Sequence, residues 1–215
     1  MPALAARIEA AIGGLLKSAR RRDAKLFIKC AAFNSIPSPT LDVTSPECGD
    51  TNSSLLIAHT PLGENRFPEL SWSRQPTTGD PGPDIVEYLV IVEDPDAPLP
   101  SPVVHGIYYG IPASKTTILP GDLRPSSDAK DAVLTGGFKY GMNRRQTVWG
   151  GARPVLGHGM HRYMFQVVGL SESIDTKGVG KVPSKEVLEK AVEGKIAAWG
   201  VWVGRFERKF GSNGE

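Results

Sequence analysis

An apolar run at residues 85–92, interrupted only by Glu87, shows no polar alternation. Such a run predicts a β-strand that is buried on both faces. It is followed by the acid- and proline-rich stretch 94–98, which cannot continue the strand because proline lacks a backbone donor and aspartate favours turns. A second β-prone run, 103–111, contains His105 near its start. We therefore expect polar side chains at the end of a buried strand, where ligand sites commonly occur.

Shorter β-prone runs indicate further strands. They are predicted at residues 40–44, 55–59, 69–72 and 199–206, with one more beginning at His161. In that last strand the period of two places His161, Tyr163, Phe165 and Val167 on one face. Residues 114–135 show no strong period and predict a long surface excursion.

Two helices are predicted. Residues 3–19 carry a short stripe of leucine and isoleucine at helical spacing, followed by a basic run from Lys17 to Arg22. Such a helix could attach to a membrane surface or act as a mitochondrial presequence; we favour a helix whose apolar stripe packs on the domain. A second helix is expected at 184–198, because Pro183 and Ser184 form a helix-start signal ahead of an apolar stripe.

Composition favours one soluble domain. The chain has 215 residues, of which 40% are hydrophobic and 22% charged, and its many glycines and prolines suit a β-rich fold. We expect a helix and lead-in at 1–30, a single domain at 31–210 and a flexible tail at 211–215.

Net charge and cysteine content limit which classes of partner and which cellular compartment we expect. A net charge of +2 gives no support for a nucleic-acid partner, and membrane contact is expected to be peripheral at most. Arg7 and Glu9 interrupt any signal-peptide core, so Cys30 and Cys48 are expected to be reduced thiols in a cytoplasmic protein.

The residues with candidate chemistry fall into three stretches. They are Asp94, Asp96, His105, His158, His161 and Tyr163, with Arg144, Arg145 and Arg153 on a preceding loop. Two histidines and a carboxylate could hold a metal, could perform acid–base catalysis, or could bind an anion together with the tyrosine hydroxyl. No G-x-S-x-G elbow and no phosphate-binding glycine loop is present, and the residues alone leave these three chemistries open.

Three motifs in order resemble the phosphatidylethanolamine-binding protein family, which includes Raf kinase inhibitor proteins and plant flowering regulators. The D-P-D-x-P motif is Asp94 to Pro98, the pocket histidine is His105 with its run to Ile111-Pro112, and the G-x-H-R motif is Gly159 to Arg162, followed by Tyr163. Each motif alone is weak, but three in the right order are specific. The bacterial and fungal branch is the most similar, and Asn143-Arg144-Arg145 together with the N-terminal stripe suggests a fungal protein.

The resemblance implies a mainly β fold, in which a large central antiparallel sheet packs on a smaller sheet with peripheral N-terminal and C-terminal helices. It also implies a small pocket that takes phosphate, acetate or a phosphoethanolamine head group in relatives. The ligand-binding residues would be Asp94, Pro98, His105, Gly159, His161 and Tyr163, with Arg144, Arg145, Arg153 and His158 at the rim. Asp96 and Arg162 would be structural, and we expect them to form an ion pair. Gly106 stands where the family usually has Trp or Phe, which implies a more open wall.

The position of Asp94 beside a predicted anion pocket requires a physical explanation. A carboxylate repels an anionic ligand unless it orients a protonated histidine. We therefore expect Asp94 to hold His105 or His161 in its charged form or in a fixed tautomer.

The expected function is a small binding protein for a phosphate- or carboxylate-bearing ligand, which could regulate a protein partner, rather than an enzyme. The alternative is a pocket enzyme, an isomerase or cyclase of fungal secondary metabolism, with Asp94, His105 and His161 as acid–base groups. A large, mostly apolar cavity would favour the enzyme, and a shallow polar notch the binder. The resemblance implies neither a metal nor a cofactor.

Overall fold

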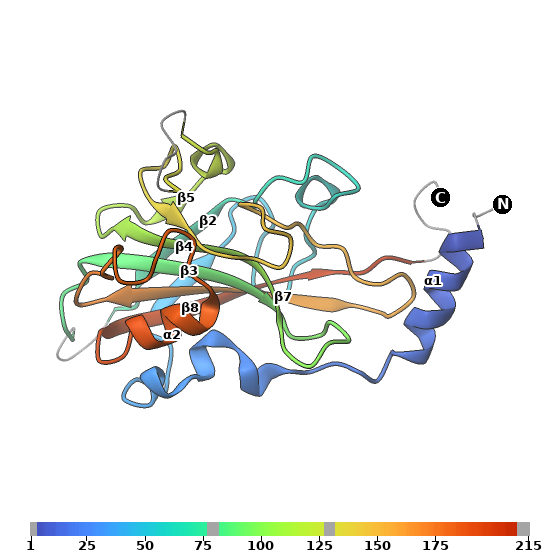
Figure 1. Cartoon of the computed structure of the whole chain (residues 1–215), viewed down its shortest axis with the longest axis horizontal. Coiled ribbons are helices and arrows are strands. Elements are labelled where there is room, and N and C mark those ends of the chain that lie inside the picture. Colours follow the sequence, from blue (N-terminus) through green and yellow to red (C-terminus); the bar gives the residue numbers. More distant parts are fainter. Residues whose placement is uncertain (1–3, 77–81, 127–131, 210–215) are drawn as a thin grey trace.

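Two antiparallel sheets form the framework of the chain in a computed structural model that describes residues 4–76, 82–126 and 132–209 (Figure 1). The larger sheet has the strand order β6-β4-β3-β7-β8 and the smaller one β1-β2-β5. The strands are β1 Leu41–Thr44, β2 Leu70–Arg74, β3 Glu87–Asp94, β4 Val103–Pro112, β5 Thr117–Ile118, β6 Lys139–Tyr140, β7 His161–Leu170 and β8 Ile196–Phe206; the helices are α1 Leu4–Leu15 and α2 Lys185–Ala191. This arrangement confirms the predicted mainly β fold with two packed sheets.

β3 is the central strand of the larger sheet, and every one of its residues is buried, as the apolar run interrupted only by Glu87 predicted. It pairs with β4 on one side and with β7 on the other. Because both pairings are antiparallel, the end of β3 lies beside the start of β4 and the start of β7: Asp94 is opposite Val103, and Glu93 is opposite Met164. The register thus brings the D-P-D-x-P and G-x-H-R motifs together at one end of the strands.

The larger sheet buries both of its faces. One face packs against the smaller sheet through residues such as Val90, Phe165 and Trp202. The other face is covered by α2 and by the segment that follows α1, with Leu89 and Ile91 packed against Phe27 and Leu188 (Figure 1). Cover on both sides explains why the central strand β3 lacks polar alternation.

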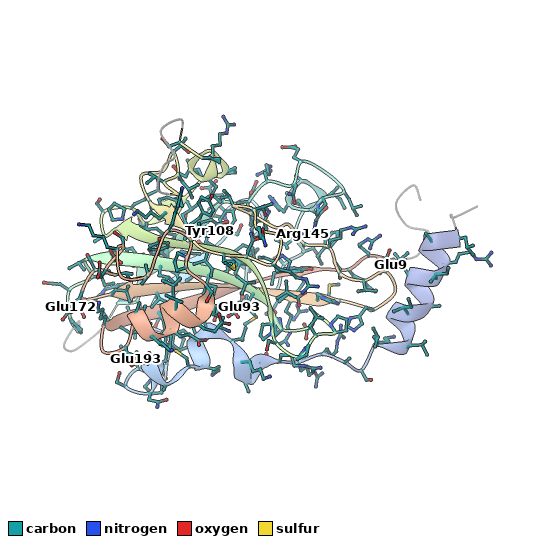
Figure 2. The ribbon with its side chains drawn as sticks, in the orientation of Figure 1. Glu9, Glu93, Tyr108, Arg145, Glu172 and Glu193 are labelled. Carbon is teal, nitrogen blue, oxygen red and sulfur yellow. The ribbon has the colours of Figure 1, made fainter. Side chains whose placement is uncertain are left out.

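A buried carboxylate fastens this second layer to the sheet. Glu93 is fully buried, and its oxygens accept hydrogen bonds from the backbone N–H of Phe27 at 2.7 Å, from Nε2 of Gln166 at 2.8 Å and from Nζ of Lys185 at 2.6 Å. Figure 2 shows Glu93 beside α2. A buried charge is tolerated when it is paired and hydrogen-bonded, and these three partners meet that requirement for Glu93.

α1 differs from the prediction, because its apolar stripe does not pack on the domain. The one buried residue described in α1 is Gly13, where an added Cβ would lie 2.1 Å from the carbonyl oxygen of Leu156. Glu9, on the side facing the domain, accepts hydrogen bonds from the backbone N–H of Leu156 and from Arg208 (Figure 2). The helix thus approaches through small residues and leaves its large ones in solvent, because a close backbone approach is possible only without a side chain.

Two further predictions were wrong in detail. The strand expected at 55–59 is a single 3-10 turn, Ile57–His59. The helix expected at 184–198 ends at Ala191, because the chain turns at Gly194, where φ is +74°, and Ile196 already belongs to β8. The surface excursion at 114–135 contains β5 and the 3-10 turn Pro120–Leu123, whereas the tail expected at 211–215 lies outside the described residues.

Cys30 and Cys48 are both free thiols. Over the residues that the structure describes, no helix has both the length and the apolar character to cross a membrane.

Neighbouring glycines in α1 provide a test of this helix contact. We expect Gly13→Ala to separate the helix from the domain, because the new Cβ would lie 2.1 Å from the Leu156 carbonyl oxygen. Gly14→Ala is the matched control, since nothing lies within 4 Å of that Cβ, and in the helix interior alanine is favoured over glycine by about 1 kcal/mol. Amide hydrogen exchange over residues 4–16 should accelerate in Gly13→Ala and slow in Gly14→Ala. Equal protection in both variants would contradict the contact.

Candidate functional site

A cavity of about 220 Å³ lies at the end of the larger sheet where β3 ends and β4 and β7 begin. The loops 94–99 and 144–155 complete its walls. Its lining contains two histidines, one aspartate, three arginines and a set of aliphatic residues: Asp94, Ala97, Pro98, Leu99, Val103, Val104, His105, Arg144, Arg145, Gly150, Arg153, Pro154, Val155 and His161. The cavity therefore combines an apolar wall with a few converging polar groups, as ligand sites commonly do.

The acidic turn after β3 is closed by the first of its two aspartates. Oδ1 of Asp94 accepts hydrogen bonds from the backbone N–H groups of Asp96, at 2.8 Å, and Ala97, at 3.1 Å. An aspartate that bonds the backbone two residues ahead stabilises such a turn locally. This leaves Oδ2 of Asp94 available for another partner.

Asp96 forms the predicted ion pair with Arg162. Its Oδ2 accepts hydrogen bonds from the backbone N–H and from Nε of Arg162, and its Oδ1 from NH2 of the same side chain. The guanidinium also donates to Asp23, just after the basic N-terminal run. Burial opposes ionisation of Asp96, but the hydrogen bonds from Arg162 outweigh it and hold the pKa of this carboxyl below its ordinary value. The pair fixes the turn against β7.

The second oxygen of Asp94 begins a chain of buried imidazoles. Nδ1 of His161 lies 2.7 Å from Oδ2 of Asp94, Nε2 of His161 lies 2.7 Å from Nδ1 of His158, and Nε2 of His158 lies 2.8 Å from the carbonyl oxygen of Leu16. The expectation that Asp94 holds a histidine is thus met by His161 and not by His105.

The row of hydrogen bonds from Asp94 through His161 and His158 to Leu16 requires one proton more than an ionised carboxylate and two neutral imidazoles carry. The carbonyl of Leu16 can only accept, so His158 carries its proton on Nε2, and neutral His158 then offers a lone pair on Nδ1. His161 then donates from Nε2 to His158, and one proton is shared between its Nδ1 and Oδ2 of Asp94. Burial, followed by the neighbouring His161, lowers the pKa of His158, consistent with a neutral ring there.

His105 is oriented by main-chain groups of a neighbouring loop. Its Nδ1 donates to the carbonyl oxygen of Gly150, and its own carbonyl accepts from the backbone N–H of Gly150 and from the side-chain amide of Asn143. Burial lowers the pKa of His105, so the ring is neutral and its Nε2 is an acceptor. Within the part of the chain that the structure describes, this Nε2 is buried and has no hydrogen-bond partner.

Tyr163 lies behind this histidine, with ring centroids 5.0 Å apart, and its hydroxyl is likewise buried and unpartnered among the described residues. Burial and the nearby carboxylates Asp94 and Asp96 raise its pKa well above the ordinary value, so the hydroxyl keeps its proton. A lone-pair acceptor on His105, which lines the cavity, and a hydroxyl donor on Tyr163, whose ring packs against that histidine, are thus both buried without partners.

Most of the predicted site residues meet at the cavity, but several do not line it. Gly159, His158 and Tyr163 lie outside the lining, although His158 and Tyr163 contact residues within it. Gly159 approaches the guanidinium of Arg20, with φ at +101°. The more open wall expected at Gly106 is absent, because the Tyr108 hydroxyl fills that space, 2.6 Å from where a Cβ would stand.

Several groups that orient the histidines of the site lie outside the motifs and were not predicted from the sequence. The main-chain carbonyl of Gly150 and the side-chain amide of Asn143 contact His105. The main-chain carbonyl of Leu16 contacts His158. A carbonyl has no residue-specific signature, so no pattern could have identified those of Gly150 and Leu16. The glycine-rich spacing around Gly150 was the only available hint.

The electrostatic balance of the cavity is positive. Asp94 is matched by the His158–His161 pair, and Asp96 by Arg162. Neither Arg144 nor Arg145 has an ion-pair partner among the described side chains, and both are exposed at the cavity. No group of three or more histidine, cysteine or acidic side chains suited to a metal ion occurs in the described ranges.

Protonation of His105 provides a pH test. Because burial lowers its pKa below 6.5, the unfolded chain binds the proton first as the pH falls, and the folded state loses stability below about pH 6.5. His105→Asn can keep the donor to Gly150 but does not titrate. We expect the stability advantage of the wild type over this variant to shrink between pH 7.5 and pH 5, measured by urea unfolding. A difference that stays constant or grows would contradict a buried neutral ring.

Comparison with known proteins is consistent with this geometry. Residues 35–207 match the family model described as phosphatidylethanolamine-binding protein. Two curated relatives, each called phomoidride biosynthesis cluster protein B, are 42% identical over 96% of this chain and 97% of a protein from a fungal species, and 40% identical over 94% of this chain and 82% of a protein from Talaromyces stipitatus. The crystal structure of E. coli YbcL, a member of the mammalian PEBP family, superimposes with a TM-score of 0.62 and 26% identity over 78% of this chain and 98% of YbcL. The chain belongs to the phosphatidylethanolamine-binding protein family.

Proposed function

We propose that the cavity binds a small carboxylate-bearing metabolite with an apolar portion. The observation that carries this proposal is the charge arrangement: two exposed arginines without ion-pair partners in the described chain, Arg144 and Arg145, face a cavity whose only acid, Asp94, is already neutralised. Arginine is well suited to carboxylates because its planar guanidinium can donate two parallel hydrogen bonds. A phosphate group would satisfy the same donors.

The dimensions favour a ligand that extends beyond the cavity. Its volume of about 220 Å³ is below the roughly 300–1,000 Å³ of typical small-molecule pockets. A neighbouring open groove of about 510 Å³ shares Leu99, Val103, Val104 and Arg144 with it, and Met142 lies along that groove. The anionic group would lie in the cavity, and a hydrocarbon portion would follow the groove, where Met142 is 48% exposed.

The names of the fungal relatives support a role in secondary metabolism. Two proteins that match nearly the whole chain are called phomoidride biosynthesis cluster protein B. A cavity that takes a small carboxylate-bearing molecule fits a protein of a biosynthesis cluster.

A chain-length series tests both parts of the binding proposal. We expect calorimetric titration, with a chelator present, to show binding of butanoate that strengthens up to decanoate by at most about 0.8 kcal/mol per buried methylene. Arg145→Gln should weaken every member of the series. Met142→Gln should weaken only the longer acids, because only they reach the groove.

The matched control for Arg145→Gln is Arg124→Gln, an exposed arginine outside the cavity, which should leave all affinities unchanged. Phosphate and phosphoethanolamine serve as competing probes. No heat from any anion would refute the pocket, whereas phosphate binding without any dependence on acid chain length would refute the apolar portion alone.

Acid–base catalysis is a second candidate, supported by the unpartnered Nε2 of His105 and the unpartnered hydroxyl of Tyr163. A neutral imidazole with a free lone pair can remove a proton from carbon next to a carboxylate-activated double bond, while a nearby hydroxyl donates. This arrangement would suit an isomerisation or cyclisation.

Deuterium incorporation tests this second candidate. With a 3-alkenoate of the best-binding length in D₂O, catalysis predicts label at the carbon next to the carboxylate, detected by NMR. His105→Asn should abolish incorporation, even though the acid still binds at Arg145. Binding without incorporation by the wild type would refute catalysis of this kind and leave the binding proposal intact.

A further inference from the structure

α1 presents an apolar face that is exposed within the part of the chain that the structure describes. Its four most exposed large residues are Leu4, Ile8, Ile12 and Leu15, with exposed fractions of 73%, 53%, 47% and 84%. Their spacing places them on one side of the helix. Isolated exposed leucines are ordinary, but a contiguous stripe of this kind marks an interaction surface.

The stripe faces away from the rest of the molecule. The opposite side of the helix makes the domain contacts, through Gly13 at Leu156, Ala10 at Gly157 and Glu9 at Arg208. α1 lies at one end of the molecule, beyond the strands (Figure 1). A flat surface could therefore touch the whole stripe without meeting the sheets.

The charge around the stripe is strongly positive. Residues 4–22 contain five basic side chains and one acidic one. Arg7, Lys17 and Arg21 are exposed, whereas the acid, Glu9, is paired with Arg208. This charge complements an anionic surface, and it opposes pairing with a second copy, which would bring like charges together.

We propose that α1 docks through its leucine and isoleucine stripe on an anionic lipid surface. The helix has 12 residues and is about 18 Å long, so it would lie in the interface plane and not cross the bilayer. Insertion of the stripe supplies apolar contact, and the basic residues supply a salt-sensitive attraction. This site is separate from the cavity.

Vesicle co-sedimentation tests the proposal with the full chain. We expect binding to vesicles of 70% phosphatidylcholine and 30% phosphatidylserine, at least tenfold weaker binding to pure phosphatidylcholine, and strong weakening in 0.5 M salt. The double variant Ile8→Gln/Leu15→Gln should bind at least tenfold more weakly. The matched control is Leu56→Gln/Ile57→Gln, which changes two residues of similar exposure, 46% and 44%, outside the helix and should bind like the wild type.

Sedimentation velocity on the same variants distinguishes the other occupants. A dimer that disappears in Ile8→Gln/Leu15→Gln, without vesicle binding, would overturn the proposal and make the stripe a self-association surface. Absence of both vesicle binding and a dimer would also overturn the proposal, and a protein partner would then be the remaining occupant of the stripe. Unfolding by urea at the wild-type midpoint would show that the variant is folded, so that lost binding reflects the stripe.

Discussion

The carboxylate of Asp94 is the group on which the rest of the site depends. One oxygen closes the turn after β3 through the backbone of Asp96 and Ala97, and the other accepts from Nδ1 of His161. Both functions use a charge that is almost fully buried, and removing one partner of such a buried pair typically costs about 3–5 kcal/mol. The strand end, the turn and the β7 histidine are therefore one unit, and a change in any of them alters all three.

Neutralisation of the acids gives the cavity its chemical character. Once Asp94 is matched by the imidazole pair and Asp96 by Arg162, the arginines at the rim dominate the local potential. His105 contributes differently, because Gly150 fixes its tautomer and leaves an acceptor at the wall. One set of groups can thus attract an anion, and another can accept a proton from it, without competing for the same atoms. This division makes the binding and the catalytic proposals separable by experiment.

The sequence was most informative where local pattern and tertiary environment agree. The apolar run of β3 and the Asp-Pro turn after it were predictable, because burial and turn chemistry both act through those residues alone. The Asp96–Arg162 pair followed from the motifs. The carbonyls of Gly150 and Leu16 were not predictable, since any residue supplies a carbonyl. The orientation of α1 was mispredicted because a stripe of leucine and isoleucine says that an apolar face exists, and not which side meets the domain.

The N-terminal segment joins the two surfaces that the proposals concern. After α1, the backbone N–H of Arg22 donates to the carbonyl of Pro95, and its Nε donates to that of Leu99, at the cavity wall. The carbonyl of Leu16 holds His158, which in turn contacts His161. Deleting the first 22 residues would therefore remove the exposed stripe and also two supports of the cavity. Loss of ligand binding in such a truncation would not distinguish docking from pocket integrity, so only substitutions on the outward face of α1 can separate the two.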